Sequence, residues 1–330
     1  MTALQDITQD SAQPETAARP NIRPVAGHIG ADISGVDISK PLSAADLAEI
    51  TDALHRYKVI FFRDQQLDHA SQIAFGRQFG DLTYAHPHDD APPQEYPEIF
   101  TIDPRRQEER YGEGFRKRVR TQYSYFNGWH TDVTAAVNPP AGSILRADIV
   151  PEIGGDTQWT NLVAAYEGLS EPVQRFVETL RAEHRYGGSR GVDHDDKYAK
   201  RVNDNLLVAI HPVVRVHPVT GEKALFVNPG FTNRIVGVSP RESEAILGLL
   251  YSEITRPEYT VRFRWEAGSV AFWDNRATAH LAPRDIEHLD LQRRLHRITL
   301  IGDVPKGPDG RESELVAGRP FTNEHTVVVD

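Results

Sequence analysis

The chain has 330 residues, of which 39% are hydrophobic and 25% charged, a composition typical of a globular protein with one large or two small domains. Its 37 Lys and Arg against 47 Asp and Glu give a net charge of −10, which argues against a general nucleic-acid binder. The lack of cysteine excludes disulfides and thiolate metal sites, so any metal must be held by His, Asp or Glu.

The N-terminal segment is rich in Ala, Thr, Gln and Pro, and it lacks the basic start and apolar core of a signal peptide. We therefore predict a disordered tail over 1–22 and a single domain over 23–330. Because no apolar run approaches the length of a membrane span, we expect a cytoplasmic protein.

The first elements are expected between residues 42 and 80. The segment 42–58 is predicted to be a helix, with Ser43 and Asp46 at its start in the spacing of a capping box. The apolar run VIFF at 59–62 predicts a buried strand, and 68–80 predicts a second helix ended by Gly80.

A long charged segment, 103–120, follows and shows no apolar period. Loops of this length are either functional or disordered, so it is expected to be a lid over a substrate or a solvated loop.

The rest of the chain alternates strands with a few helices. Helices are predicted within 161–184, with a restart at Ser170 and Pro172, and over 239–254. The second of these begins with a capping box and carries an apolar stripe of Ile246, Leu249, Leu250 and Ile254. Strands are predicted at 142–147, 224–228, 261–265, 269–273 and 297–302. Without a regular βαβ rhythm, this order favours a mainly β fold, a sandwich or jelly roll flanked by helices.

Two of the candidate metal ligands lie in the stretch GWHTDVT at 128–134. In a strand, His130 and Asp132 would project from one face. His280, just after the apolar strand 269–273, is the third candidate. Two histidines and one carboxylate suit non-haem Fe(II), although zinc could use the same residues.

Paired arginines form the second indication of a site, in QRRLHRITL. On a strand, Arg293 and Arg297 share one face while Arg294 and His296 point to the other. Two buried guanidinium groups require an anion, such as the carboxylate of a co-substrate, or else they reach solvent or acidic side chains.

Together these residues resemble the taurine dioxygenase family of Fe(II)- and 2-oxoglutarate-dependent oxygenases over roughly 24–305, with a further likeness to alkylsulfatase and aryloxyalkanoate dioxygenases. The motifs are GWHTDVTAAVNPPAGSIL, GGDTQWTN, WDNRATAH and HRITLIGD. The resemblance implies a double-stranded β-helix and a homo-oligomer. It implies that iron is held by His130, Asp132 and His280, and that 2-oxoglutarate is held by Thr157 and Arg293, with Arg294 as the alternative anchor.

The same resemblance indicates a small anionic substrate that is oxidised by O2, with release of succinate and CO2. The substrate-binding residues are expected to be His86, Arg297, Phe126 and Asn127. A sulfonate or sulfate ester is the first expectation, and a carboxylate such as an aryloxyalkanoate or an amino-acid derivative is the alternative. A metal-dependent hydrolase or a non-catalytic metal-binding sandwich would need the metal ligands but not Thr157 and Arg293.

Overall fold

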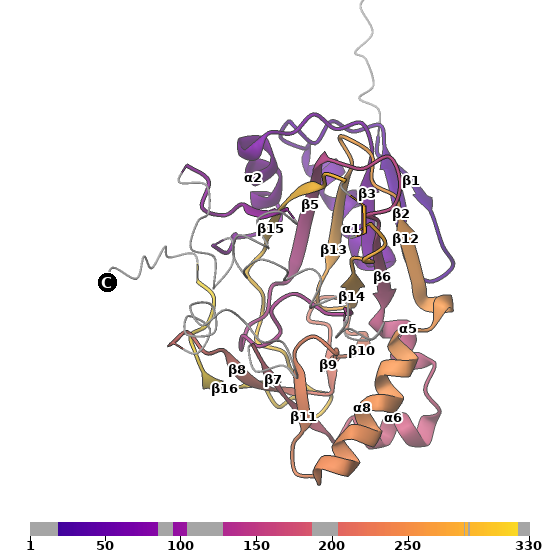
Figure 1. The fold of residues 1–330 in the computed structure, drawn as a ribbon, viewed down its shortest axis with the longest axis vertical. Coiled ribbons are helices and arrows are strands. Elements are labelled where there is room, and N and C mark those ends of the chain that lie inside the picture. The colour runs from indigo at the N-terminus through magenta and orange to yellow at the C-terminus, as the bar shows by residue number, and fades with distance from the viewer. Residues whose placement is uncertain are drawn as a thin grey trace, which may run out of the picture.

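The computed structural model describes residues 19–84, 95–103, 128–186, 204–286, 288–289 and 291–322. A seven-stranded sheet forms one wall of the fold (Figure 1). Its strands, in spatial order, are β1 (Asn21–Pro24), β2 (Ala31–Ser34), β3 (Val59–Phe62), β13 (Val270–Asp274), β5 (Gly142–Ile149), β15 (Arg294–Thr299) and β4 (Phe100–Ile102). β2 pairs with β3 in parallel, and the other neighbours described in this sheet pair antiparallel.

Three smaller sheets complete the β structure of the described residues. One has the order β12 (Thr260–Phe263), β6 (Thr157–Asn161) and β14 (Thr278–Leu281). Another has the order β11 (Thr232–Ile235), β7 (Arg181–Arg185), β8 (Val208–Pro212) and β16 (Glu314–Ala317). The third pairs β9 (Val214–Val216) with β10 (Lys223–Leu225). The jelly-roll architecture predicted from the sequence is confirmed.

Apolar residues cover both faces of the seven-stranded sheet. Ile60 and Phe62 of β3 pack on the side of α1 (Ala44–Tyr57) and α2 (His69–Arg77). Val59 and Phe61 of the same strand pack on the other side, against Trp159 of β6. This alternation explains why the run 59–62 is apolar throughout: a strand covered on both faces needs an apolar residue at every position.

The remaining helices of the described residues are α5 (Leu162–Glu167), α6 (Glu171–Val177), α8 (Pro240–Ile254) and the 3-10 turn η1 (Pro257–Tyr259). The helices α5, α6 and α8 lie at the end of the molecule away from α2 (Figure 1). The capping box predicted at Ser239 is present, with Glu242 bonding back to its backbone. None of the helices in the described ranges has the length and apolar character needed to cross a bilayer.

Several sequence-based boundaries are wrong. The helix expected to reach Gly80 ends at Arg77, because the next turn uses i→i+3 hydrogen bonds from Gln78 and Phe79. The helical segment predicted to reach residue 184 gives way to β7, in which Ala182 and His184 are buried between charged neighbours. In α8, Leu249 is 49% exposed and Leu247 takes its place in the core.

The strands also differ in extent from the prediction. The segment expected as a strand over 224–228 pairs only at 223–225, and β15 begins three residues earlier than predicted, at Arg294. Strand β1 begins at Asn21, inside the predicted tail, because it pairs with β2. Except for Asp103, the predicted lid lies outside the described residues.

Candidate active site

The three predicted metal ligands meet between the sheets. His130 and His280 face each other in an antiparallel bridge, with N···O distances of 2.9 and 2.7 Å, and their ring centroids are 4.2 Å apart. One ligand atom from each of His130, Asp132 and His280 lies within 4.8 Å of the others.

The route by which Asp132 reaches this cluster differs from the prediction. Residues 132–135 form a turn rather than a strand, and Val133 has a φ of 43°, which is unusual for a β-branched residue. Thr131 fixes the start of the turn by donating a hydrogen bond to the carbonyl of Thr278, at 2.7 Å. The i, i+2 alternation of a strand is therefore not what aligns the two side chains.

The Asp132 carboxylate is buried and charged. Burial raises its pKa, but Arg297 and the two histidines outweigh that effect and hold the pKa well below the usual range. Arg297 donates to Oδ1, and Ser143 donates to Oδ2 at 2.6 Å. Sequence reasoning missed Ser143, because a serine within a predicted strand carries no signal of its own.

Both histidines are neutral. Burial is the main cause that lowers the pKa of His130 and His280. The Nδ1 of His130 lies 3.0 Å from the carbonyl of Gly128, which leaves Nε2 with a free lone pair. His280 Nε2 lies 3.8 Å from Asp132 Oδ1, and its buried Nδ1 has no hydrogen-bond partner among the described residues. A divalent metal ion is well matched by two neutral imidazoles and one ionised carboxylate. The ring nitrogen of His280 that is unpaired in the described structure is consistent with such a site.

A buried cation lies nearby at the start of β15. Arg293 is 8% exposed, and its Nε donates to the carbonyl of Gly155 at 2.8 Å. Burial lowers its pKa to about 10, so it stays charged near neutral pH. It forms no ion pair with any residue that the structure describes, which leaves its terminal nitrogens available to an anion.

Thr157 and Gly155 belong to the segment that Arg293 contacts. Thr157 is buried, and its hydroxyl accepts a hydrogen bond from Trp265 Nε1 at 2.9 Å. Gly155 has a φ of 69°, and an added Cβ would come within 3.1 Å of Arg293 Cδ. Only glycine allows this approach without strain. Sequence reasoning passed over Gly155, although the pair GG before a strand was a signal for a turn.

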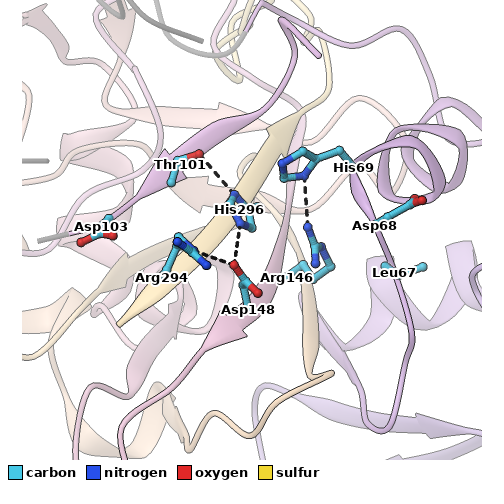
Figure 2. A pocket seen from close by; sticks show the side chains of 9 residues that line it. All are labelled: Leu67, Asp68, His69, Thr101, Asp103, Arg146, Asp148, Arg294 and His296. Atoms are coloured by element: carbon cyan, nitrogen blue, oxygen red, sulfur yellow. Dashed lines mark hydrogen bonds and ion pairs between the residues drawn. The ribbon is translucent and has the colours of Figure 1, made fainter. Parts of the chain in front are cut away.

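Arg294 points to the opposite face of the sheet. It is 42% exposed and its Nε donates to Asp148 at 2.6 Å, beside His296 (Figure 2). Arg297, by contrast, lies with Asp132 between the sheets. The alternation predicted from QRRLHR is thus confirmed, and of the two arginines considered as anchors only Arg293 is buried on the inner side.

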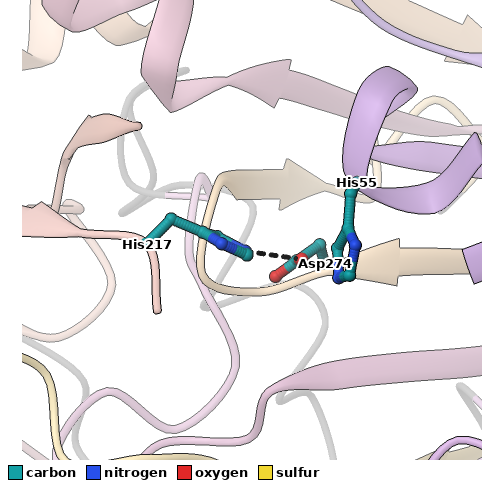
Figure 3. A group of neighbouring side chains, drawn as sticks. All are labelled: His55, His217 and Asp274. Carbon is teal, nitrogen blue, oxygen red and sulfur yellow. Dashed lines mark hydrogen bonds and ion pairs between the residues drawn. The ribbon is translucent and has the colours of Figure 1, made fainter. Parts of the chain in front are cut away.

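A second cluster, of His55, His217 and Asp274, has metal-like spacing (Figure 3), but hydrogen bonds occupy both oxygens of Asp274 and both ring nitrogens of His217. Arg276 donates to both Asp274 oxygens, at 2.8 and 2.7 Å, and His217 Nε2 donates to one of them at 2.9 Å. His217 Nδ1 accepts from the backbone of Val219 and Thr220. This cluster is an ion-pair network that ties α1 to the end of β13.

Three of the predicted substrate residues, His86, Phe126 and Asn127, lie outside the described residues. The fourth, Arg297, is 7% exposed, and its Nε is buried with no hydrogen-bond partner within the described part of the chain.

These features define a class: a jelly-roll protein with a candidate site for a divalent metal and a separate buried cation that is available to an anion. The chain belongs to the family described as "Taurine catabolism dioxygenase TauD, TfdA family", whose model matches residues 21–299. The predicted family and class, an Fe(II)- and 2-oxoglutarate-dependent dioxygenase, are therefore confirmed.

Individual relatives agree with this assignment. An alpha-ketoglutarate-dependent sulfate ester dioxygenase of Pseudomonas putida is 40% identical over 304 residues, covering 89% of this chain and 93% of that protein. An alkylsulfatase of Acinetobacter baylyi is 37% identical and covers 92% of each chain. A crystal structure of a taurine dioxygenase from Burkholderia xenovorans superposes with a TM-score of 0.79 at 49% identity, covering 91% of this chain and 96% of that one.

Proposed function

We propose that this dioxygenase oxidises a C–H bond of a small sulfate ester or sulfonate, and that His130, Asp132 and His280 hold its Fe(II). The observation that carries the metal assignment is the donor set, in which two neutral imidazoles and one carboxylate lie within 4.8 Å. When bound, Fe(II) and 2-oxoglutarate supply the activation of O2, with release of succinate and CO2. The protein's part is to orient the ligands, bind the anions and exclude water.

Arg293 and Thr157 are proposed to bind the 2-oxoglutarate. The buried guanidinium of Arg293, which forms no ion pair with a described residue, matches a carboxylate well, because it can form two parallel hydrogen bonds. The Nε bond to Gly155 fixes the orientation of the Arg293 fork. Thr157 already accepts a hydrogen bond from Trp265, so its hydroxyl proton is free to be donated to a carboxylate.

Arg297 is proposed to contact the substrate anion, together with His86, Phe126 and Asn127. The buried Nε of Arg297 has no hydrogen-bond partner among the described residues, which supports an anion at this position. Relatives named as a sulfate ester dioxygenase and an alkylsulfatase favour a sulfate ester over a carboxylate. Insertion of one oxygen atom into a C–H bond of the carbon that bears the ester oxygen would give a hydroxylated sulfate ester. Its bond between that carbon and the ester oxygen then breaks to release an aldehyde and hydrogen sulfate.

The test separates co-substrate binding from substrate choice. Under anaerobic conditions, Fe(II) and 2-oxoglutarate should give the weak visible charge-transfer band of their chelate. An alkyl sulfate, taurine and an aryloxyacetate are then added separately, O2 is admitted, and succinate, sulfate and sulfite are measured.

We expect a band and succinate formation with stoichiometric sulfate from the alkyl sulfate. Succinate with sulfite would favour a sulfonate, and stimulation by the aryloxyacetate alone would overturn the sulfur-oxyanion assignment. The absence of a band with iron bound would contradict the roles of Arg293 and Thr157. A homo-oligomer remains a prediction, which size-exclusion chromatography with light scattering would test.

A further inference from the structure

A second pocket, of about 510 Å³, lies on the outer face of the seven-stranded sheet (Figure 2). Its walls include Arg146 and Asp148 of β5, Arg294 and His296 of β15, and His69 of α2. Their strand neighbours of opposite parity, such as Leu145 and Leu295, pack in the core between the sheets. The sheet itself therefore separates this pocket from the candidate active site.

Arg146 is the unusual residue of this pocket, because it is 9% exposed and forms no ion pair within the described part of the chain. Its Nε donates to Gln72 Oε1 at 3.1 Å, and its Nη2 lies 3.1 Å from His69 Nδ1. Its Nη1 has no partner among the described residues. Both groups that contact Arg146 are neutral, so neither compensates its charge.

The orientation of the Gln72 amide toward Arg146 is determined by hydrogen bonds at its other atom, Nε2. Gln72 is fully buried, and its Nε2 donates to the carbonyls of His296, at 2.8 Å, and Ile144, at 3.2 Å. Its Oε1 must therefore face the arginine. The Nδ1 of His69 accepts from the always-charged guanidinium, which places the ring proton of His69 on Nε2 as a further donor at the pocket wall.

Two of the carboxylates that line the pocket are bonded to other groups. Asp148 Oδ2 receives Arg294 Nε at 2.6 Å and lies 3.2 Å from His296 Nε2. Asp68 caps α2 by accepting from the backbone and hydroxyl of Ser71. Asp148 and Asp68 act on Arg146 only through space, and burial is the larger influence on its pKa, which it lowers. Asp103, at the end of β4, also lines the pocket.

We propose that this pocket is a binding site for a small oxyanion, with a sulfate, sulfonate or carboxylate group held by the terminal nitrogens of Arg146. A charged guanidinium buried among neutral partners is costly unless an anion completes it. The amide of Gln72 and the ring of His69 orient the guanidinium toward the cavity. A binding site requires such supporting contacts, because they hold the binding group in position. Arg294 also lines the wall, where its charge is paired with Asp148.

The proposal is tested by measuring the melting temperature in increasing concentrations of sodium sulfate and, separately, of sodium acetate. Sodium chloride at equal ionic strength is the reference. The proteins are Arg297→Gln, which removes the proposed substrate anchor, and the same variant carrying Arg146→Met or Arg175→Gln. Arg175 is exposed on α6 and pairs only with Glu171 in the described structure. Arg175→Gln is therefore the control, because it removes one positive charge, as Arg146→Met does, but away from the pocket. Sulfate also stabilises proteins non-specifically, without saturation.

We expect a saturable rise in melting temperature in Arg297→Gln and in its Arg175 derivative, and a smaller one in the Arg146 derivative, in which Arg293 is still able to bind an anion. Comparison of the sulfate and acetate titrations shows whether the pocket prefers a tetrahedral oxyanion or a planar carboxylate. An equal saturable rise in all three proteins would overturn the proposal, as would none in any. If Arg146→Met does not fold, Arg146→Lys keeps the charge and should bind at least about tenfold more weakly, as expected for the loss of one charged hydrogen bond. Unchanged affinity in that variant would also overturn it.

Location is checked independently with selenate, a sulfate analogue with an anomalous X-ray signal. Crystals soaked in selenate should show an anomalous peak beside Arg146. A peak only between the sheets, beside Arg293 or Arg297, would assign all the binding to the active site and refute the second pocket.

Discussion

Arg297 donates a hydrogen bond to Oδ1 of Asp132, so the carboxylate of the candidate metal site is also the counterion of a buried arginine. Both side chains are more than nine-tenths buried. A metal ion at Asp132 would share this carboxylate and release part of the arginine's hydrogen-bonding capacity. If Asp132 holds the metal and Arg297 binds the substrate, the two binding events are linked through this one pair of residues.

Replacing Arg297 by Gln should destabilise the metal-free protein by about 3 kcal/mol, because the buried Asp132 then loses the arginine that compensates its charge. Urea unfolding in the presence of a chelator measures this free energy. Mn(II) should raise the melting temperature of this variant more than that of the wild type, since the ion replaces the lost positive charge.

The double variant Asp132→Asn with Arg297→Gln is the control for that experiment. It removes both charges, so it should regain part of the lost stability while failing to respond to Mn(II). If the double variant were as unstable as Arg297→Gln alone, packing rather than the ion pair would be the cause.

His280→Ala should abolish high-affinity Mn(II) and Fe(II) binding, because three ligands within 4.8 Å are reduced to two. Equilibrium dialysis followed by metal analysis gives the stoichiometry. His55→Gln is the matched control, since His55 belongs to the hydrogen-bonded cluster with Asp274 and should keep one metal per chain. Loss of metal in His55→Gln but not in His280→Ala would reverse the assignment of the two clusters.

The choice between Arg293 and Arg294 can be decided by 2-oxoglutarate binding. Arg293→Gln should weaken 2-oxoglutarate binding by about a hundredfold, the effect of about 3 kcal/mol for a lost charged contact. Arg294→Gln removes an exposed pair with Asp148 and should change it by less than about threefold. Titration of the charge-transfer band measures both, and metal affinity should stay close to that of the wild type in each.

Part of this site could be read from the sequence because it follows strand alternation. The order QRRLHR assigns Arg293 and Arg297 to one side and Arg294 to the other, and β15 follows that rule. Local signals also gave the start of α8, where the capping box at Ser239 determines the first turn.

Other parts depend on contacts between distant segments. The turn that presents Asp132 requires a positive φ at Val133, a conformation that no local preference of valine predicts. Ser143 and Gly155 matter only because Asp132 and Arg293 are brought against them. Strand β7 was not predicted, because a short segment with Ala182 and His184 between charged residues can also belong to an amphipathic helix.

Acid should destabilise the protein partly through His211, which is buried next to the turn that carries Asp132. Its Nε2 lies 2.7 Å from the carbonyl of Thr134, and burial lowers its pKa to about 3. Because the folded state holds the neutral ring, this contribution is complete above the unfolded pKa of about 6.5 and is lost as the pH falls toward 3. Between about pH 7 and about pH 4.5 the loss from this one group is about 2 kcal/mol.

Urea unfolding of the wild type and of His211→Asn at the two pH values isolates that contribution. The variant should be less stable than the wild type near neutral pH, because Asn packs less well in a fully buried position. Its stability should nevertheless fall less on acidification, by about 2 kcal/mol. His184 is also buried with a pKa held well below its usual value, so some acid sensitivity should remain in the variant. Parallel pH dependence in the two proteins would show that His211 does not gain its proton on unfolding in this range.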